Sequence, residues 1–193
     1  MTTYFVCGVD EAGRGPLAGP VFAAAVVLGP PPHIDGLDDS KKLTPEVRAE
    51  LEKVIQARAL DWAVACASAA EIDRYNILRA TLLAMRRAIT QLKPGVAEAL
   101  IDGTHCPLVP CLTRAIPGGD ALIAEISAAS ILAKTARDRR MCELDRLYPQ
   151  YGFAQHKGYS TREHMDAINR YGPSPEHRRS FAPVRLALQM TLY

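Results

Sequence analysis

Four acidic side chains stand where an apolar segment of the sequence ends or where a helix is about to begin. They are Asp10, Glu11, Asp102 and Asp120. Asp10 and Asp102 each follow a short apolar run, so if the two runs are neighbouring strands, their ends meet at one cleft. Carboxylates gathered there can hold hard divalent cations, with phosphate oxygens and water filling the remaining positions. Two such ions activate water and stabilise a leaving oxygen, so the pattern predicts two-metal hydrolysis of a phosphodiester.

Each of these acids also has an ordinary structural interpretation. An aspartate at a strand end commonly serves a turn, and one ahead of a helix most often caps it, which is the better explanation of Asp120 taken alone. The adjacent pair Asp10 and Glu11 favours a site, because two neighbouring carboxylates repel one another in a low-dielectric environment unless a cation is present. Strand alternation points neighbours to opposite faces, so we expect the strand to end or bend there.

The glycine-rich stretch 13–19 lies directly after the first acidic pair. It differs from a dinucleotide-binding loop, because its glycine spacing is one residue too long, Pro16 removes a backbone donor, and an apolar strand follows in place of a helix. Its glycines permit close approach of a ligand backbone, with Arg14 beside them as a phosphate contact. The alternative is a tight turn with a solvated arginine.

The elements that must position these residues form an α/β pattern. We predict strands at 4–9, 21–28, 62–67, 96–101 and 111–116, and helices at 45–58, 77–92 and from about 120 to 147. The first of these helices has Thr44 as its N-cap and Pro45 at its first position. We expect one domain, 1–193, with an α/β core over 1–147 and a basic C-terminal helical segment over 148–193. The small residues around 127–133 predict close packing of their helix on the sheet.

Composition sets broad limits. The 193 residues carry 23 Lys plus Arg against 21 Asp plus Glu and are 48% hydrophobic, which is typical of a soluble domain and excludes a histone-like polycation. Five scattered cysteines indicate reduced thiols and no zinc site. With neither a membrane span nor a secretory signal in evidence, we expect a cytoplasmic protein. We also expect it to be a monomer. Residues 1–133 hold 12 basic and 15 acidic side chains and residues 134–193 hold 11 and 6, so the basic charge gathers in the C-terminal part.

A series of short motifs across nearly the whole chain resembles ribonuclease HII, the type 2 ribonuclease H. The opening motif is Asp10-Glu11-Ala12-Gly13-Arg14-Gly15 with Gly19-Pro20-Val21. The blocks that follow in family order are Asp39–Leu43, Leu100–Gly103, Gly119-Asp120, Ala128–Lys134, Arg137-Asp138, Tyr151–Phe153, His156–Tyr159, His164, Gly172–Ser174, His177-Arg178 and Ser180-Phe181. The resemblance implies a ribonuclease H-like fold, a mixed central sheet flanked by helices. It also implies an endonuclease that cleaves the RNA strand of RNA/DNA hybrids and cuts 5′ of ribonucleotides embedded in duplex DNA, leaving 3′-hydroxyl and 5′-phosphate ends.

The resemblance also assigns roles to residues. Asp10, Glu11, Asp102 and Asp120 match the family's carboxylates for Mn²⁺ or Mg²⁺, and Gly13, Arg14 and Gly15 match the loop that contacts the ribose 2′-hydroxyl. Tyr159 matches a tyrosine that stacks on the sugar after the scissile ribonucleotide, and Lys41, Lys42 and Lys134 are candidate phosphate contacts. The sequence departs from the family pattern at Gly119, Thr104 and Ser160, none of which is a carboxylate position. The related ribonuclease HIII has an extra N-terminal domain, whereas the first strand here begins near Met1, which favours ribonuclease HII.

Three further interpretations stay open at this point. The chain could be a non-catalytic hybrid- or DNA-binding module of the same fold, although such a module has no use for uncompensated carboxylates. The histidines His156, His164 and His177 are expected in structural or phosphate-contact roles. The last residues, 189–193, resemble peptides that dock bacterial sliding clamps, but a C-terminal helix packed on the core is the better explanation.

Overall fold

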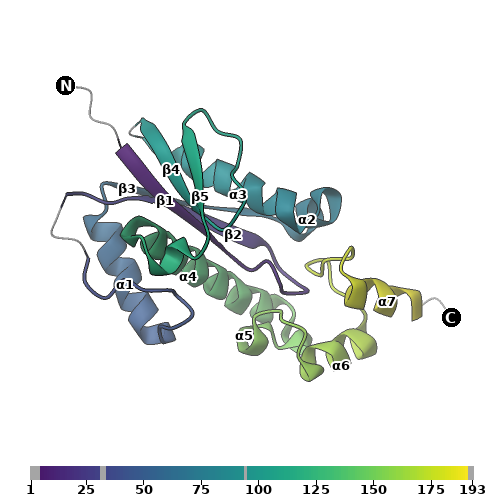
Figure 1. The fold of residues 1–193 in the computed structure, drawn as a ribbon. Coiled ribbons are helices and arrows are strands. Elements are labelled where there is room, and N and C mark those ends of the chain that lie inside the picture. Colours follow the sequence, from purple (N-terminus) through teal and green to yellow (C-terminus); the bar gives the residue numbers. More distant parts are fainter. Residues whose placement is uncertain (1–4, 31–33, 94, 191–193) are drawn as a thin grey trace.

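The computed structural model describes residues 5–30, 34–93 and 95–190. Within these ranges the chain forms one five-stranded sheet with helices around it (Figure 1). The strands are β1 Phe5–Ala12, β2 Val21–Val27, β3 Asp61–Ala67, β4 Val96–Asp102 and β5 Leu112–Ile116. The helices are α1 Pro45–Arg58, α2 Ala69–Tyr75, α3 Ile77–Gln91, α4 Ala124–Leu147, α5 Phe153–His156, α6 Arg162–Tyr171 and α7 Ala182–Met190, with short 3-10 turns η1 Gly119–Ala121 and η2 Pro149–Tyr151.

The sheet is mixed, as expected, and β1 lies at its centre. The strand order is β3-β2-β1-β4-β5. β1 runs antiparallel to β2, with Asp10 opposite Ala24, and parallel to β4, with Val9 opposite Ile101. Because the carboxyl ends of parallel neighbours meet at one edge of a sheet, this register sets Asp10 next to Asp102.

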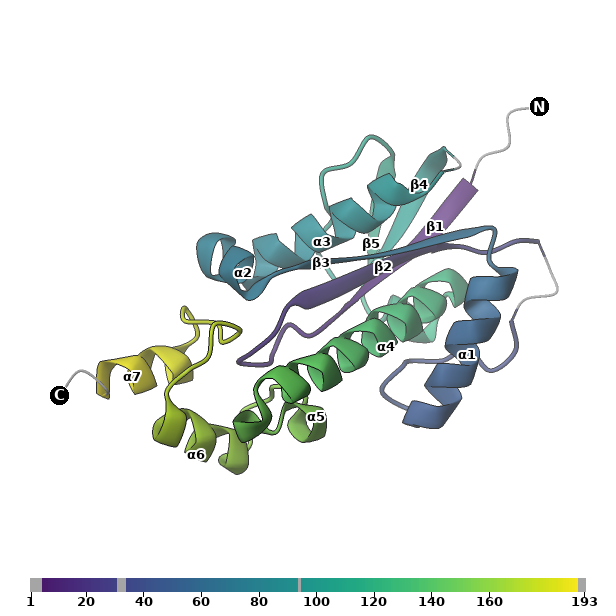
Figure 2. The same cartoon turned by 180° about the vertical axis from the view of Figure 1, so that it is seen from behind.

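Helices cover both faces of the sheet (Figure 2). Alternate residues of β1 and β2 divide between two apolar clusters, so that Val9 packs on the side of α3 and Ala24 on the side of α4. A side chain at Gly8 would meet the backbone carbonyl carbon of Glu125 at 2.1 Å, so α4 lies directly against β1. This contact and the fully buried small residues Ala128, Ala129 and Ala133 confirm the close packing predicted for this helix.

Local signals in the sequence account for most helix boundaries. Thr44 caps α1 by accepting from the amide of Val47. The short helix α2 was not predicted, yet Ser68 and Glu71 form a capping box, a signal that the sequence contains. Asp120 is not the cap of the long helix, because it lies in η1 and α4 begins after Ile123, which has no side-chain cap bond.

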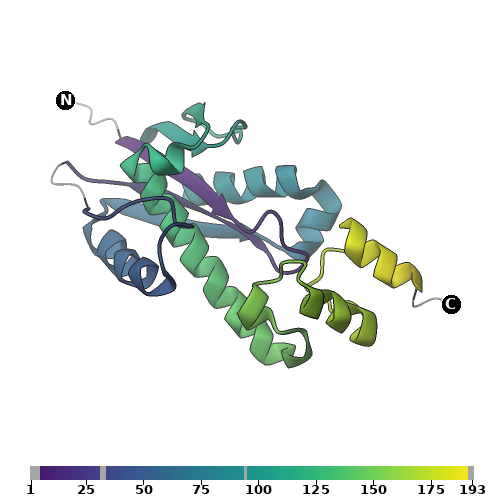
Figure 3. The same ribbon diagram turned by 60° about the horizontal axis from the view of Figure 1, so that its bottom comes forward.

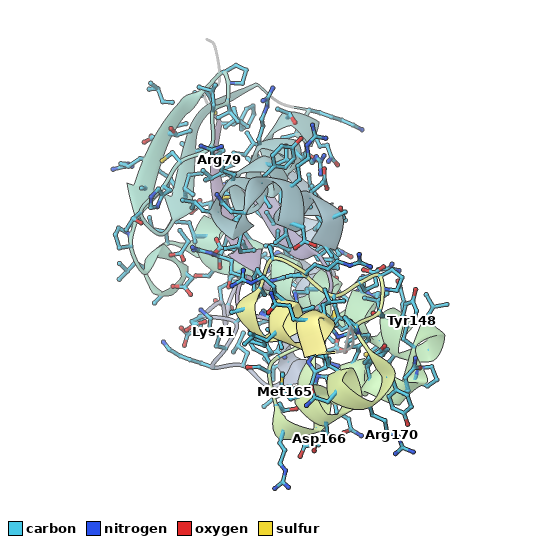
Figure 4. All side chains as sticks on the ribbon, turned by 90° about the vertical axis from the view of Figure 1, so that its right-hand side faces the viewer. Lys41, Arg79, Tyr148, Met165, Asp166 and Arg170 are labelled. Carbon is cyan, nitrogen blue, oxygen red and sulfur yellow. The ribbon has the colours of Figure 1, made fainter. Side chains whose placement is uncertain are left out.

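The C-terminal helices α5, α6 and α7 form the expected appendage beside the end of α4 (Figure 3). Seen from the side of α7, Asp166 and Arg170 project outward from α6, away from the rest of the molecule (Figure 4). The inner side of the appendage is apolar, with Phe153 and Val184 fully buried. No helix in the described ranges is long and apolar enough to span a bilayer.

Candidate active site

Three carboxylates meet at the edge of the sheet where β1 and β4 end. Each of Asp10, Asp102 and Asp120 offers a carboxylate oxygen, and these oxygens lie within 4.8 Å of one another. Asp10 comes from β1, Asp102 closes β4, and η1 brings in Asp120. The Ser127 hydroxyl donates to the carbonyl of Asp120 at 2.6 Å, which anchors η1 to α4. The sequence prediction that these acids converge is therefore confirmed geometrically.

The electrostatics of this cluster favour a bound cation. Burial raises the pKa of Asp10 well above its usual range, and the charges of Glu11 and Asp102 raise it further. Burial and the charge of Asp102 likewise raise the pKa of Asp120. Like charges held this close oppose ionisation unless a cation offsets them. Since the ligands on offer are carboxylate oxygens, the donor set fits a hard divalent ion such as Mg²⁺ or Mn²⁺.

Glu11 lies outside this cluster of three, and the strand does not break to admit it. β1 keeps its pairing with β2 through Ala12 opposite Phe22, so the expected end or bend at Asp10 and Glu11 is wrong. Alternation instead puts Glu11 on the α3 face, where it lines a small cavity together with Asp102 and Thr81. Because Asp102 is the last residue of β4, side chains from both faces of the sheet reach its end. Burial raises the pKa of Glu11, while Arg14 acts against this rise.

Asp10 and Asp102 open onto a cavity of about 240 Å³ that is also lined by Glu11 and by the glycine loop. The residues that line it are Asp10, Glu11, Ala12, Gly13, Arg14, Gly15, Ser40, Lys41, Asp102, Ser130, Lys134, Arg137 and Tyr159. Gly13 has a φ of +98°, and a side chain there would meet Nε of the buried Arg137 at 1.9 Å. A glycine at this position is therefore required by the loop's conformation and by the close approach of α4.

Lys41 is brought to the cavity by the loop that precedes α1. The hydroxyls of Ser40 and Ser130 are 2.9 Å apart, and Nη1 of Arg48 donates to the carbonyl of Ser40 at 2.8 Å. This places Nζ of Lys41 3.7 Å from Oδ2 of Asp120. Desolvation opposes the charge of Lys41, but the carboxylates of Asp39 and Asp120 outweigh it and raise its pKa.

The remaining predicted contacts differ in position. Lys134 lines the cavity, and its Nζ donates to Asp138 at 2.7 Å. Tyr159 is about half exposed, and its ring lies 3.6 Å from where a side chain on Gly15 would begin. Lys42 is not brought into the cavity; it pairs with Asp38 at 3.0 Å. The structure therefore brings every proposed substrate contact except Lys42 to one cavity.

Several residues that shape the site were missed or misjudged. Ser130 was assigned to helix packing, although it lines the cavity beside Asp10. Arg137 and Arg178 were matched within family motifs without any role, and both are fully buried. His164 and His177 are also buried, which leaves the structural alternative for them and excludes phosphate contact. No local pattern separates a buried arginine or histidine from an exposed one, so only the fold could reveal these positions.

Comparisons with known proteins agree with the fold and with the family resemblance of the sequence motifs. The family model described as Ribonuclease HII matches residues 7–184. The ribonuclease HII of Bordetella avium is 59% identical over 180 residues, covering 93% of this chain and 89% of that protein. That of Nitrosospira multiformis is 59% identical over 181 residues, covering 94% of this chain and 91% of its own.

Solved structures of related ribonucleases share the fold of this chain. The ribonuclease H2 of Pyrococcus horikoshii superposes with a TM-score of 0.80 at 27% identity, over 96% of this chain and 98% of that one. Bst-RNase HIII in complex with Mn²⁺ gives a TM-score of 0.79 at 20% identity, over 97% of this chain and 70% of its own, and so supports the fold. Since the family model and these relatives span nearly the whole sequence, the chain belongs to the ribonuclease HII family and is an enzyme of the ribonuclease H type.

Proposed function

We propose that this enzyme cleaves the RNA strand of RNA/DNA hybrids and cuts 5′ of single ribonucleotides embedded in duplex DNA, leaving 3′-hydroxyl and 5′-phosphate ends. The observation behind the proposal is that one cavity is lined both by Asp10 and Asp102, two of the three converging carboxylates, and by the exposed loop residues Arg14 and Gly15. The 2′-hydroxyl is the group that distinguishes a ribonucleotide within a duplex, so whatever contacts it must lie next to the cleavage chemistry.

The carboxylates are the residues that would bind the metal ions. Asp10, Asp102 and Asp120, with Glu11 approaching from the α3 face, would hold two Mg²⁺ or Mn²⁺ ions. These ions supply an activated water and stabilise the leaving oxygen. Bst-RNase HIII, a relative in fold, is known in complex with Mn²⁺.

The other residues around the cavity bind and orient the substrate. Lys41 and Lys134 are placed to contact phosphates, which position a duplex without reading its sequence. The half-exposed ring of Tyr159 offers an apolar face for a sugar beside the loop. Because its charge is committed to Asp38, Lys42 is the weakest of the proposed phosphate contacts.

The test is cleavage of a DNA duplex that carries one ribonucleotide, with Mg²⁺ or Mn²⁺, by the wild type and by Asp10→Asn. We expect the variant to lose roughly a thousandfold in rate, because the stabilisation that metal ions supply amounts to several kcal/mol. Lys42→Ala is the matched control and should retain most activity. Cleavage without metal, an undiminished Asp10→Asn variant or equal cleavage of an all-DNA duplex would each refute the proposal.

A sliding clamp is a further proposed partner, through residues 189–193. Residues 191–193 lie outside the described residues, and Leu188 packs partly against the apolar cluster of α6 and α7. An RNase HII of Archaeoglobus fulgidus, 22% identical, was solved in complex with PCNA. Deletion of residues 189–193 should abolish binding to a bacterial clamp and leave cleavage of a short duplex unchanged. Unchanged clamp binding would dismiss the idea.

A further inference from the structure

The glycine loop between β1 and β2 lies against the segment that leads into α7, as Figures 1 and 2 both show. Backbone hydrogen bonds join the two. The amide of Gly19 donates to the carbonyl of Glu176 at 2.9 Å, and the amide of Arg178 donates to the carbonyl of Leu17 at 2.8 Å. One wall of the cavity is therefore held in place by residues from the far end of the chain.

The side chain of Arg178 adds a second set of bonds to the same loop. Its guanidinium group is fully buried, and it donates from Nη2 to the carbonyl of Gly13 at 2.6 Å. Nη1 donates to the carbonyl of Arg14 at 2.9 Å, and Nε donates to the carbonyl of Gly19 at 3.0 Å. Burial lowers the pKa of Arg178 to about 9, which still leaves the group charged at neutral pH. One planar side chain thus fixes three carbonyls of the loop.

Those carbonyls determine where the neighbouring amides point. In a planar trans peptide the C=O and N–H bonds have opposite directions. When the carbonyls of Gly13 and Arg14 face Arg178, the N–H groups of Arg14 and Gly15 must face away from it. Both residues are exposed and line the cavity, and neither amide donates to an acceptor within the described residues. The cavity that Asp10 and Asp102 line therefore also has two amide donors that find no acceptor among the described residues.

A purely packing role does not explain this arrangement well. Burying a guanidinium group is costly, and Arg178 lies close enough to Arg137 for the two charges to oppose one another. The Nε of Arg137 is itself buried and has no hydrogen-bond partner in the part of the chain that the structure describes. An apolar side chain of similar volume would pack without that cost but could not orient peptide groups. The two buried cations beside the loop also favour an electron-rich group in the neighbouring cavity.

We propose that Arg178 is a positioning residue, which orients the amides of Arg14 and Gly15 towards the cavity and thereby sets the enzyme's preference for a ribonucleotide over a deoxyribonucleotide. The proposal rests on the function proposed above. By this proposal the C-terminal segment contributes to substrate selectivity through the buried Arg178 and not through its exposed basic residues.

The test measures binding selectivity, which a merely structural role would not change. Two DNA duplexes, one with a single ribonucleotide and one without, are titrated by fluorescence anisotropy in Ca²⁺, and the ratio of the two Kd values gives the selectivity. For Arg178→Lys, which keeps the charge but loses the planar fork, we expect this ratio to fall roughly tenfold, about the value of one well-oriented hydrogen bond. The Kd for the all-DNA duplex should change less than about twofold.

Asp73→Asn is the matched control. Asp73 accepts from the amides of Arg179 and Ser180 and so ties down the same segment without touching the loop carbonyls. This variant should lose thermal stability and keep the wild-type selectivity. If Arg178→Lys keeps the selectivity too, the inference is wrong while the proposed function stands. If the wild type itself binds both duplexes equally, the function and the inference fall together.

A second pair of variants decides the question should Arg178→Lys fail to fold. Gly15→Pro removes one of the two amide donors and leaves Arg178 intact. Gly15→Ala keeps the donor and adds a side chain at an ordinary contact distance, 3.6 Å from the ring of Tyr159. We expect a clearly larger loss of selectivity in the proline variant than in the alanine variant. Equal losses would overturn the inference, because they would trace the effect to bulk alone.

Discussion

A buried pair of histidines connects the C-terminal helices to the site. The amide of Ser174 donates to Nδ1 of His177 at 2.9 Å, so the proton of the neutral His177 ring is on Nε2. That Nε2 donates to Nε2 of His164 at 3.0 Å, and Nδ1 of His164 in turn donates to the carbonyl of Tyr159 at 2.8 Å. A proton added to either ring would break this chain of bonds, which ends at a residue of the cavity.

Lowering the pH tests whether the fold depends on neutral His164 and His177. Burial lowers the pKa of His164 to about 4 and that of His177 to about 3, from 6.5. Below pH 6.5 the unfolded chain takes up protons that the folded chain refuses, so the stability that these groups contribute is complete above pH 6.5 and lost as the pH falls towards 3 to 4. Between pH 7.5 and pH 5.5 each histidine therefore lowers the free energy of unfolding by about 1.4 kcal/mol, and the pair lowers it by about 2.8 kcal/mol.

The assay is urea unfolding followed by circular dichroism at both pH values. The raised pKa of Asp10 has the opposite effect, because the folded state favours the protonated carboxyl and so gains stability as the pH falls. The pH dependence of the wild-type unfolding free energy therefore does not isolate the histidines. The contribution of Asp10 is the same in wild type and in His177→Gln, so it cancels when the unfolding free energies of the two proteins are subtracted. This difference should be about 1.4 kcal/mol smaller at pH 5.5 than at pH 7.5. His105→Gln, at an exposed histidine bonded to Thr104, is the control and should give no such change. A difference between wild type and His177→Gln that is independent of pH would refute the reasoning.

Three further outcomes are expected. Gly13→Ala should lower the unfolding free energy by about 1–3 kcal/mol in urea titrations, because its φ of +98° and the contact with Arg137 both strain a side chain there. Lys41→Ala should weaken duplex binding and reduce the slope of log Kd against log salt by about one, whereas Lys42→Ala should change it less. Mg²⁺ should raise the melting temperature of the wild type through binding to the folded state, and Asp120→Asn should diminish that shift, as differential scanning fluorimetry can measure.

The convergence of the acids could be predicted because it follows from local signals combined with one pairing. Apolar runs that end at Asp10 and Asp102 mark strand ends, and parallel pairing then sets the two residues side by side. The role of Asp120 as a cap was wrong because the chain makes a 3-10 turn first and restarts its helix after Ile123. That interruption depends on the bond from Ser127 to the carbonyl of Asp120, which no sequence window displays.

The position of Glu11 shows where a correct local rule led to a wrong expectation. Alternation does separate Asp10 and Glu11 onto opposite faces, and the error was to infer that the strand must break for both to share a cleft. A cleft at the end of a strand is open to both faces, so Glu11 reaches the vicinity of Asp102 from the side of α3. The sequence showed the alternation, but it did not show that β4 ends at Asp102 and so leaves the cleft open to both faces of the sheet.

The basic C-terminal part of the chain illustrates why a charge count does not locate a binding surface. Of the arginines after residue 133, Arg137 and Arg178 are buried and orient backbone, and Arg139 makes two bonds to Glu52 at 2.9 and 2.8 Å. Arg140 pairs with Glu143 at 3.0 Å. Arg170 stays exposed and projects from α6 (Figure 4).

Much of the positive excess after residue 133 therefore stabilises the fold or shapes the glycine loop and is not available to phosphates. Two of the four cations that line the cavity come from elsewhere, Lys41 from the loop before α1 and Arg14 from the glycine loop, and the other two, Lys134 and the buried Arg137, come from α4. Contact between the appendage and a duplex stays a prediction, and it depends on exposed arginines such as Arg170. If those arginines do bind phosphates, their substitution should weaken affinity equally for duplexes with and without a ribonucleotide, whereas substitution of the buried Arg178 should affect selectivity.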